Sequence, residues 1–371
     1  WSTDADVLLE ATTVVRIATS THLRGSFAII QSIIDAGLVP VFVELLKREE
    51  APELQYEAGW VLLNVAAGTR EQTASLIDHG AVPILVRLLH SPSPGVREQA
   101  VWALGNTAAD PAGRDLALES GALEPLLRQL QAPDATPNMA WVGAWALSCL
   151  CWPGGQARLT VEHARRVLLV LAPLITPSAD ERLLQDALMT ARHAPAQAVV
   201  AAGLCPRVAP LLEHPSAAVR AAAVGVVQRV VAGNDRETQA MVEADVLPRL
   251  LSMLRAPGAA RTLQTVCCAI SNVAAVTEDQ TQAVIDAGLI PPLLRLAGGS
   301  AAEGPGSDCR VRNDAAWAVG NTLIGGNREQ VAYLVEEAAC IPPLCRLLDA
   351  GGADAPTADV VLTGLERVVE V

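Results

Sequence analysis

A short motif recurs along this chain at a nearly constant spacing, and the spacing constrains the fold more than any other feature. The motif is an acidic residue, any residue, Gly, two apolar residues and Pro, followed by a leucine-rich stretch. Its clearest copies are DAGLVPVFVELL from Asp35, DHGAVPILVRLL from Asp78 and DAGLIPPLLRLA from Asp286. Looser copies begin at Glu119, Ala201, Glu243 and Glu337, so the start positions advance by 43, 41, 82, 42, 43 and 51 residues. The step of 82 residues spans two periods, with the degenerate copy EHARRVLLVLAPLI from Glu162 between them.

Each copy has the chemistry of a joint between two helices. Gly can end a helix because it takes the left-handed conformation without steric cost, and Pro can begin the next because its missing N–H is not needed there. A turn such as SPSPG (91–95) then precedes a third, longer helix. Three helices in about 42 residues predict an all-α, right-handed superhelical solenoid of armadillo repeats, whereas two longer helices would indicate HEAT repeats.

The repeat predicts one armadillo domain over residues 1–371, with about eight repeats and an incomplete last one. The longest single step has a visible cause, because residues 298–309 read GGSAAEGPGSDC. This composition predicts a flexible insertion in a loop between helices.

The composition restricts which partners the chain is expected to bind and whether it could span a membrane. The chain is 51% hydrophobic but only 3% aromatic, which suits close packing of small helices. Its 40 acidic and 27 basic residues give a net charge of −13, which argues against a nucleic-acid partner and is compatible with a basic partner or with solubility alone. The best apolar run, Val167–Ile175, is interrupted by Pro173 and is too short for a membrane span.

The sequence indicates neither an enzyme nor a metal or cofactor site. No CxxC pair occurs among the eight cysteines, and no histidine stands at a ligand spacing from them, so a reducing, intracellular compartment is expected. No strand pattern, phosphate-binding loop or recognisable catalytic set of Ser, His, Asp or Cys is present.

Three segments carry a Trp followed four residues later by Asn: EAGWVLLNVAAG, QAVWALGNTAAD and AAWAVGNTLIG. The pairs are Trp60/Asn64, Trp102/Asn106 and Trp317/Asn321. Residues at i and i+4 share one face of a helix, so stacked helices would present aromatic faces beside amides, a surface suited to an extended peptide. The alternatives are that each Trp belongs to the core and that each Asn bonds a neighbouring helix turn.

Several long stretches resemble the importin alpha family, and the resemblance covers essentially the whole chain. They are LLEATTVVRIATS (8–20), QSIIDAGLVPVFVELL (31–46), EQAVWALGNTAAD (98–110), AISNVAAVTEDQTQAVIDAGLIPPLL (269–294) and YLVEEAACIPPLCRLL (333–348). The resemblance implies a nuclear import cargo adaptor that binds Lys/Arg-rich nuclear localization signals in its concave groove and shuttles between cytoplasm and nucleus. An armadillo scaffold of the catenin type is the alternative, although catenin-like grooves are basic and take acidic ligands.

The resemblance also implies a major peptide site on three successive long helices. The matching residues are Trp60, Asn64, Trp102, Asn106 and Trp145, with Cys149 where a third Asn would stand. The family's lysine pocket would consist of the Gly68 carbonyl, the Thr73 hydroxyl and the Asp110 carboxylate, and Gln99 could add a polar contact. Asp110 could instead simply cap the helix that starts at Pro111.

A minor site is expected on later repeats, with Thr238, Asn272, Asp314, Trp317 and Asn321 in matching positions. Cys268 replaces a Trp and Arg229 replaces an Asn, so this site should be weaker or altered.

The chain begins at Trp1 without Met, so we expect it to be a fragment of a longer protein. The family's basic N-terminal segment, which binds importin beta, is expected to be absent here, and an export receptor is a further partner by resemblance. Neither a nucleic acid nor a membrane is expected as a partner.

Overall fold

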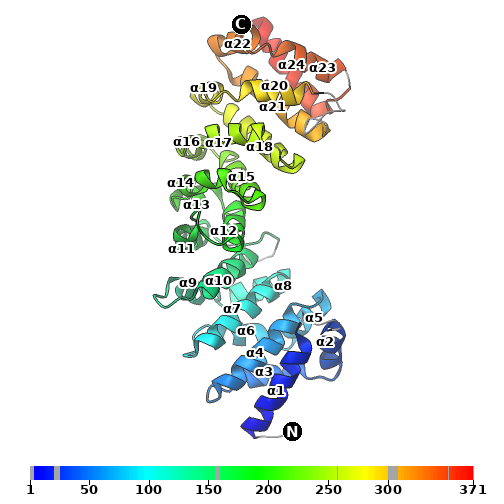
Figure 1. Cartoon of the computed structure of the whole chain (residues 1–371), viewed down its shortest axis with the longest axis vertical. Helices are drawn as coiled ribbons and strands as arrows, with labels where there is room; N and C mark the ends of the chain where they lie inside the picture. Colours follow the sequence, from blue (N-terminus) through cyan, green and yellow to red (C-terminus); the bar gives the residue numbers. More distant parts are fainter. Residues whose placement is uncertain are drawn as a thin grey trace. The chain divides into compact units, whose positions relative to one another are not determined.

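The computed structural model describes residues 4–20, 26–154, 159–256, 258–299, 308–349 and 351–370 (Figure 1). Within these ranges all regular structure is helical, and no strand occurs. The chain divides into two compact units, Trp1–His163 and Ala164–Val371. Each unit is a stack of short and long helices.

The first unit contains ten helices and the start of an eleventh among its described residues. They are α1 (Ala5–Thr19), α2 (Ser26–Asp35), α3 (Val39–Leu45), α4 (Pro52–Ala66), α5 (Arg70–Asp78), α6 (Ala81–Leu88), α7 (Pro94–Ala108), α8 (Pro111–Glu119), α9 (Leu123–Gln131), α10 (Pro137–Leu150) and the beginning of α11 (Val161–Leu171). Two short helices precede each of the long helices α4, α7 and α10, as the repeat predicts.

The second unit repeats this pattern. Its elements are the remainder of α11, η1 (Ala172–Leu174), α12 (Glu181–His193), α13 (Ala196–Ala201), α14 (Cys205–Val208), η2 (Ala209–Glu213), α15 (Ala217–Val231), α16 (Asp235–Glu243), α17 (Val246–Arg255), α18 (Ala260–Ala274), α19 (Glu278–Asp286), α20 (Ile290–Ala297), α21 (Cys309–Gly325), α22 (Arg328–Glu336), α23 (Ile341–Asp349) and α24 (Ala355–Glu370). The sequence predicts a single armadillo domain over residues 1–371. Because this depends on how the two units join, it stays a prediction.

The long helices form the spine of each unit. In the first unit α1, α4, α7 and α10 each pack on the next, and in the second α12, α15, α18, α21 and α24 do the same. Fully buried aliphatic side chains such as Leu62, Leu104 and Leu147 fill the space between them. Burying a Leu side chain contributes about 1.5–3 kcal/mol, so this periodic core holds the stack together.

The joints between the short helices need a left-handed residue. Gly37, Gly80, Gly121, Gly203 and Gly288 all have φ between 67° and 80°. Asp245 (φ 62°) and Ala339 (φ 52°) occupy the same place in looser copies of the motif. Non-glycine residues adopt this conformation at a cost of about 1 kcal/mol or more, so the joint geometry is retained even where Gly is lost.

Two parts of the repeat differ from the expectation. The degenerate copy from Glu162 forms one helix, α11, that runs on into the single turn η1, and none of its residues adopts the left-handed conformation that makes the joint in the other copies. In the expected insertion at 298–309, residues 300–307 lie outside the described residues. Its last two residues are ordered into the next helix, because the Asp308 side chain accepts from the Arg310 N–H at 2.9 Å and Cys309 begins α21.

None of the described helices is by itself long and apolar enough to cross a membrane. Only the pair Phe27–Asp35 and Val39–Leu45 meets the length and composition criteria together, and it is bent by 87°. None of the eight cysteines, all of which lie in the described ranges, forms a disulfide. No group of three potential metal ligands occurs among the described residues.

Candidate peptide-binding site

Four aromatic side chains form a continuous row across the long helices of the first unit. Tyr56 and Trp60 lie on α4, Trp102 on α7 and Trp141 on α10. Ring centroids are 5.6 Å apart for Tyr56–Trp60, 6.4 Å for Trp60–Trp102 and 5.7 Å for Trp102–Trp141. All four residues are half-buried, so the row lies at the surface and not in the core. We call these four residues the aromatic row.

The sequence prediction found only half of this row. It included Trp60 and Trp102, but not Tyr56 or Trp141. A signal was present, because Tyr56 precedes Trp60 by four residues and Trp141 precedes Trp145 by four, the spacing of one helix face.

Trp145 lies next to the row and packs on a glycine of the preceding long helix. A Cβ on Gly105 would stand 2.3 Å from a ring carbon of Trp145. Any larger residue at this position would push the ring away, so Gly105 lets the indole of α10 approach the backbone of α7 beside Asn106.

The asparagines of the three Trp/Asn pairs all donate to the preceding long helix. Asn106 Nδ2 donates to the Leu63 carbonyl at 3.2 Å, and Asn321 Nδ2 donates to Ser271 Oγ at 3.0 Å. Asn64 Nδ2 donates to Thr19 Oγ1 at 3.1 Å and lies near the Arg16 carbonyl at 3.5 Å. Asn64 is only 3% exposed, whereas Asn106 and Asn321 are half-buried. The alternative that each Asn bonds a neighbouring helix therefore holds for one N–H of each amide. The side chains of Asn106 and Asn321 are also partly exposed at the surface.

The three residues of the predicted lysine pocket lie near the α4–α5 connection. Asp110 Oδ1 accepts from the Ala112 N–H at 2.9 Å as the cap of α8, and Oδ2 pairs with Arg70 Nε at 3.0 Å. Thr73 is buried, and its hydroxyl lies 3.1 Å from both the Ala66 and Thr69 carbonyls. A Cβ on Gly68 would stand 2.2 Å from Gln72 Oε1, the side chain that closes the capping box of α5.

The other polar residues of the predicted major site differ in accessibility. Gln99 is buried, and its Oε1 makes no hydrogen bond within the described part of the chain. Glu98, also one turn before Trp102, is half-buried and accepts from Thr136 Oγ1 at 3.5 Å and from Asn138 Nδ2. Glu98 is thus a surface carboxylate next to the aromatic row that the sequence prediction did not include.

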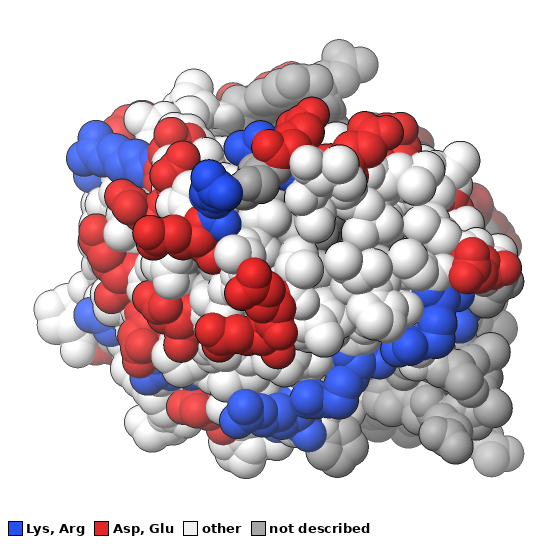
Figure 2. All heavy atoms as spheres, turned by 90° about the horizontal axis from the view of Figure 1, so that it is seen from above, with Lys and Arg blue, Asp and Glu red and all other residues white. Residues whose placement is uncertain are grey.

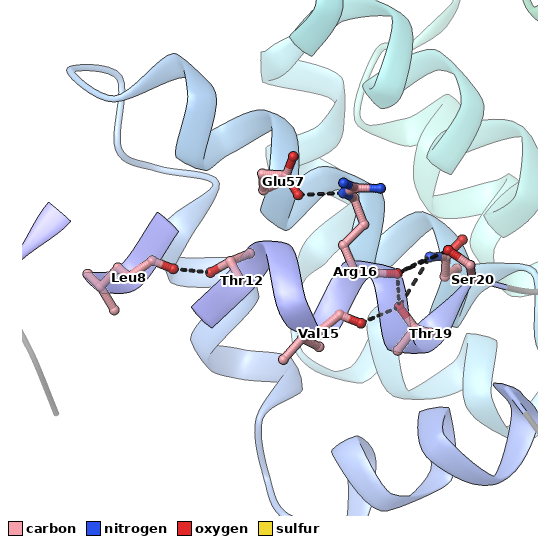
Figure 3. Close-up of polar contacts among 8 residues, drawn as sticks. Leu8, Thr12, Val15, Arg16, Thr19, Ser20 and Glu57 are labelled. Carbon is pink, nitrogen blue, oxygen red and sulfur yellow. Dashed lines mark hydrogen bonds and ion pairs between the residues drawn. The ribbon is translucent and has the colours of Figure 1, made fainter. Parts of the chain in front are cut away.

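The last turn of α1 contacts the Trp60/Asn64 pair through Arg16 and Thr19. Figure 3 shows these two α1 residues, with Arg16 beside Glu57. The Arg16 guanidinium carbon lies 5.6 Å from the centroid of a Trp60 ring. Its Nε forms an ion pair with Glu57 Oε2 at 2.5 Å. Trp60 therefore already carries a cation on its ring face.

The predicted minor site in the second unit has a single indole. Trp317 and Asn321 on α21 are half-buried, and so is Asn272 on α18. Thr238 is fully buried, with its hydroxyl 3.4 Å from the Val231 carbonyl, the same helix-to-helix contact that Thr73 makes with Ala66.

Asp314 and Cys268 lie together where the minor site lacks its second Trp. Burial raises the pKa of the Asp314 carboxyl, against the lowering effect of hydrogen bonds from Gln264 and Cys268. Burial, and then the charge of Asp314, raises the pKa of the Cys268 thiol to about 12. Asp314 Oδ2 is buried without a hydrogen-bond partner among the described residues. A cation that reached this carboxylate would therefore meet an unsatisfied acceptor.

Two arginines lie on α12 and α15, the first two long helices of the second unit. A Cβ on Gly225 would stand 3.1 Å from Arg192 Cδ, so the Arg192 side chain lies across this glycine. Arg229 is exposed, and its Nε donates to the Ala194 carbonyl at 3.0 Å. The His193 pKa is lowered by burial and by the charges of Arg192 and Arg229. This stretch of α12 and α15 is cationic and does not suit a lysine-rich ligand.

Comparisons with known proteins identify the class that these helices define. The model of the Armadillo/beta-catenin-like repeat matches residues 27–67, 69–109, 234–275 and 277–323. The crystal structure of an engineered protein is similar, with a TM-score of 0.84 and 26% identity, over 99% of this chain and 86% of that one. The chain is an armadillo-repeat protein, as the repeat predicted.

Its relatives identify the family. Importin subunit alpha-1b of Oryza sativa subsp. japonica is 40% identical over 377 residues, covering 100% of this chain and 67% of that protein. Importin subunit alpha-8 of Arabidopsis thaliana is 35% identical and covers 100% of this chain and 80% of that protein. Importin subunit alpha-1a of rice is 43% identical over 74% of this chain and 52% of that protein. The chain belongs to the importin alpha family, a family of transport adaptors and not of enzymes.

Proposed function

We propose that this chain is a nuclear import adaptor that binds Lys/Arg-rich nuclear localization signals of cargo proteins on the first unit. The observation that carries the proposal is the aromatic row, with Asn106 and Trp145 beside it. No other described surface of the chain combines closely spaced aromatic rings with exposed amides.

The chemistry of the row suits a basic peptide. A Lys or Arg stem can lie on an indole face while the cation interacts with the ring, which contributes roughly 0.5–2 kcal/mol per contact. The Asn106 amide has an acceptor oxygen for a peptide N–H, which would hold the ligand in register. Stacked helices lie about 8–10 Å apart and an extended peptide advances about 3.3 Å per residue, so each helix would meet two or three ligand residues.

The lysine pocket of the proposal centres on Asp110. Its present partner, Arg70, has a side chain that is 77% exposed. An exposed ion pair of this kind is worth about 0–1 kcal/mol, so a ligand lysine can replace it at little cost. Gly68 would then contribute its carbonyl oxygen, whereas the buried Thr73 hydroxyl, which is already bonded to the Ala66 carbonyl, would take part only if the ligand lysine displaced that bond.

The proposed second site, on α18 and α21, is weaker. Trp317 supplies one ring, and Asp314 supplies a carboxylate with an unsatisfied oxygen. Cys268 has no aromatic face, and Thr238 is too buried to contact a peptide. If a peptide has two basic clusters, one of them would bind this second site with lower affinity than the other binds the first unit.

The other partners follow from the family. We propose cytoplasm and nucleus as the locations of the whole protein, with importin beta and a nuclear export receptor as further partners. The net charge of −13 favours basic ligands in general. Figure 2 shows the face seen from above, where acidic side chains form a large group at the left with others at the top and right, and basic side chains form a band along the lower part with a few at the upper left.

Titration of a Lys/Arg-rich heptapeptide at two salt concentrations tests the proposal. We expect a dissociation constant of about 1 μM or tighter at low salt, which weakens as salt rises because surface charge attraction is screened. The control is a peptide of the same length with every basic residue replaced by norleucine or Gln. Absence of binding at low salt, or equal binding of the control, would sink the proposal.

A further inference from the structure

We propose that Arg192 and Arg229, on α12 and α15 of the second unit, form an anion site for the phosphate of a phosphorylated residue in a bound peptide. The inference rests on the proposed function, because it assumes that a peptide lies along the long helices. It adds one contact for negative charge to a chain whose other proposed contacts take cations.

Gly225 makes room for the Arg192 side chain. A Cβ on Gly225 would stand 3.1 Å from Arg192 Cδ, 3.3 Å from Nε and 3.4 Å from Nη1. The guanidinium of Arg192 therefore lies against the backbone of α15. It makes no hydrogen bond or ion pair within the part of the chain that the structure describes, and the residue is half-buried.

Arg229 brings a second guanidinium to the same end of α12. It stands one turn after Gly225 on α15, so the two residues share one face of that helix. Its Nε donates to the Ala194 carbonyl at 3.0 Å, just beyond Arg192 in the chain. Arg229 is exposed, and of its guanidinium N–H groups only this one binds a described residue. Most donors of the two guanidiniums are therefore unused.

The acidic residue on the same helix does not offset these positive charges. Burial alone raises the pKa of Asp186, to about 6, and neither arginine counteracts this rise. Burial, and then the charges of Arg192 and Arg229, lower the pKa of His193, against the raising effect of a hydrogen bond with the Met189 backbone. Both guanidinium charges therefore reach the end of α12, where an anion would reduce their repulsion.

The plainer alternative is that these arginines only cap α12. Basic residues in the last turn of a helix suit the negative end of its dipole, and Arg192 and His193 occupy that turn. Capping uses a single side-chain donor, however, the Nε of Arg229. The remaining N–H groups form forks that match phosphate oxygens, and two forks suit the double charge of a phosphate better than a single carboxylate.

A peptide at the proposed second site can reach this pair of arginines. α15 packs on α18, which carries Asn272, and α18 packs on α21, which carries Trp317. Neighbouring helices lie about 8–10 Å apart, and an extended chain advances about 3.3 Å per residue. A residue about three positions beyond a basic cluster on α18 and α21 would therefore lie over α15.

The experiment uses a peptide with two basic clusters joined by a Gly/Ser spacer. One spacer residue, about three positions from each cluster in turn, is phosphoserine, serine or glutamate. Calorimetry measures each affinity, and the quantity compared is the ratio to the serine peptide. The variants are Arg192→Gln/Arg229→Gln and Arg192→Gln alone, which removes a guanidinium that caps nothing and covers the case in which the double variant misfolds. The matched control, Arg182→Gln, removes one charge at the exposed start of α12.

We expect a phosphoserine ratio of at least about 3 at one position for wild type and Arg182→Gln, and a smaller ratio for glutamate. The phosphoserine ratio should fall below about 2 in Arg192→Gln and to about 1 or less in the double variant. Because the chain has a net charge of −13, a phosphate without an anion site would weaken binding. Histidine NMR locates the effect, since the phosphoserine peptide should raise the pKa of His193 and the serine peptide should not.

A wild-type ratio of 1 or less at both positions, an equal ratio for glutamate, or a ratio unchanged in the arginine variants overturns the inference, while binding of the serine peptide shows that the proposed function stands. If the serine peptide does not bind, the proposed function fails. An excess of acetyl-Gly-phosphoserine-Gly-amide then tests the two arginines alone: a raised His193 pKa supports the anion site, and an unchanged one overturns it.

Discussion

The two units stack their long helices in the same way but present different side chains along them. The first unit carries the aromatic row and Trp145, whereas the second carries Trp317 alone, with Cys268, Gly225 and Met189 at the corresponding places. Both units keep buried aliphatic residues between the helices, such as Val61 and Leu104 in one and Val226 and Ile270 in the other. The comparison teaches that the repeat keeps an aliphatic core in both units, while the side chains on the proposed binding face differ between them.

Reversing the charge of Asp110 should have the largest effect on the first unit. Asp110→Lys replaces attraction by repulsion at the proposed lysine pocket and leaves Arg70 without its partner. We expect heptapeptide affinity to fall by about 30-fold or more. The matched control is Glu44→Lys, which changes the net charge equally at an exposed position of α3. Equal losses for the two variants would show that only net charge matters.

Removing one indole from each unit tests the comparison directly. Trp102→Ala should weaken the single-cluster heptapeptide by about 10-fold, because the ring lies between two other members of the row. Trp317→Ala should change the same affinity by less than about 2-fold. Isothermal titration calorimetry of both variants measures this, and an equal loss would mean that the second unit is the main site.

Substitution of Asn64 and of Asn106, the asparagines of the two Trp/Asn pairs in the first unit, should have separate effects on stability and on peptide binding. Asn106→Ala should weaken the peptide by about 3- to 5-fold, because it removes the exposed amide. Asn64→Ala should leave affinity within about 2-fold but lower the free energy of unfolding by about 1 kcal/mol, because Thr19 loses a buried partner. Thermal melts and titrations of both variants are sufficient. If Asn64→Ala weakens binding more than Asn106→Ala, the peptide contacts the Asn64 amide rather than the Asn106 amide.

The smallest expected effect is the gain in peptide affinity from a second basic cluster that binds the second unit. This gain should depend on pH. A cation binds the ionised Asp314 carboxylate, whose pKa is raised by burial above the ordinary 3.8. The benefit of a second basic cluster, about 2- to 3-fold, should therefore be present at neutral pH and be lost as pH falls through this raised pKa. Asp314→Asn should remove both the benefit and its pH dependence. A benefit unchanged in this variant would exclude Asp314 from the site.

The fold could be predicted from the sequence because its determinants are local. The Gly–Pro joints, the spacing of apolar residues and the period of about 42 residues act within one repeat. The common face of Trp60 and Asn64 also followed from helix geometry alone. The degenerate copy from Glu162 departs from this local rule, because none of its residues takes the left-handed conformation and α11 runs on into η1.

The site could be predicted only in part because its accessibility depends on neighbouring repeats. Arg16 precedes Trp60 by more than one repeat period, and no local pattern indicates that its guanidinium lies on that ring. The burial of Thr73 and Thr238 depends equally on how short helices pack against the end of a long one. The amino-acid types of the binding face were predictable, but their exposure was not.

The position of a bound peptide tests the central claim most directly. A heptapeptide with a photoreactive residue at its centre, cross-linked to the wild-type protein and mapped by mass spectrometry, reports that position without any substitution in the chain. We predict cross-links on α7 and α10, next to Trp102 and Trp141, which an excess of unlabelled peptide abolishes. Cross-links concentrated on α18 and α21, or unaffected by the competitor, would contradict the account.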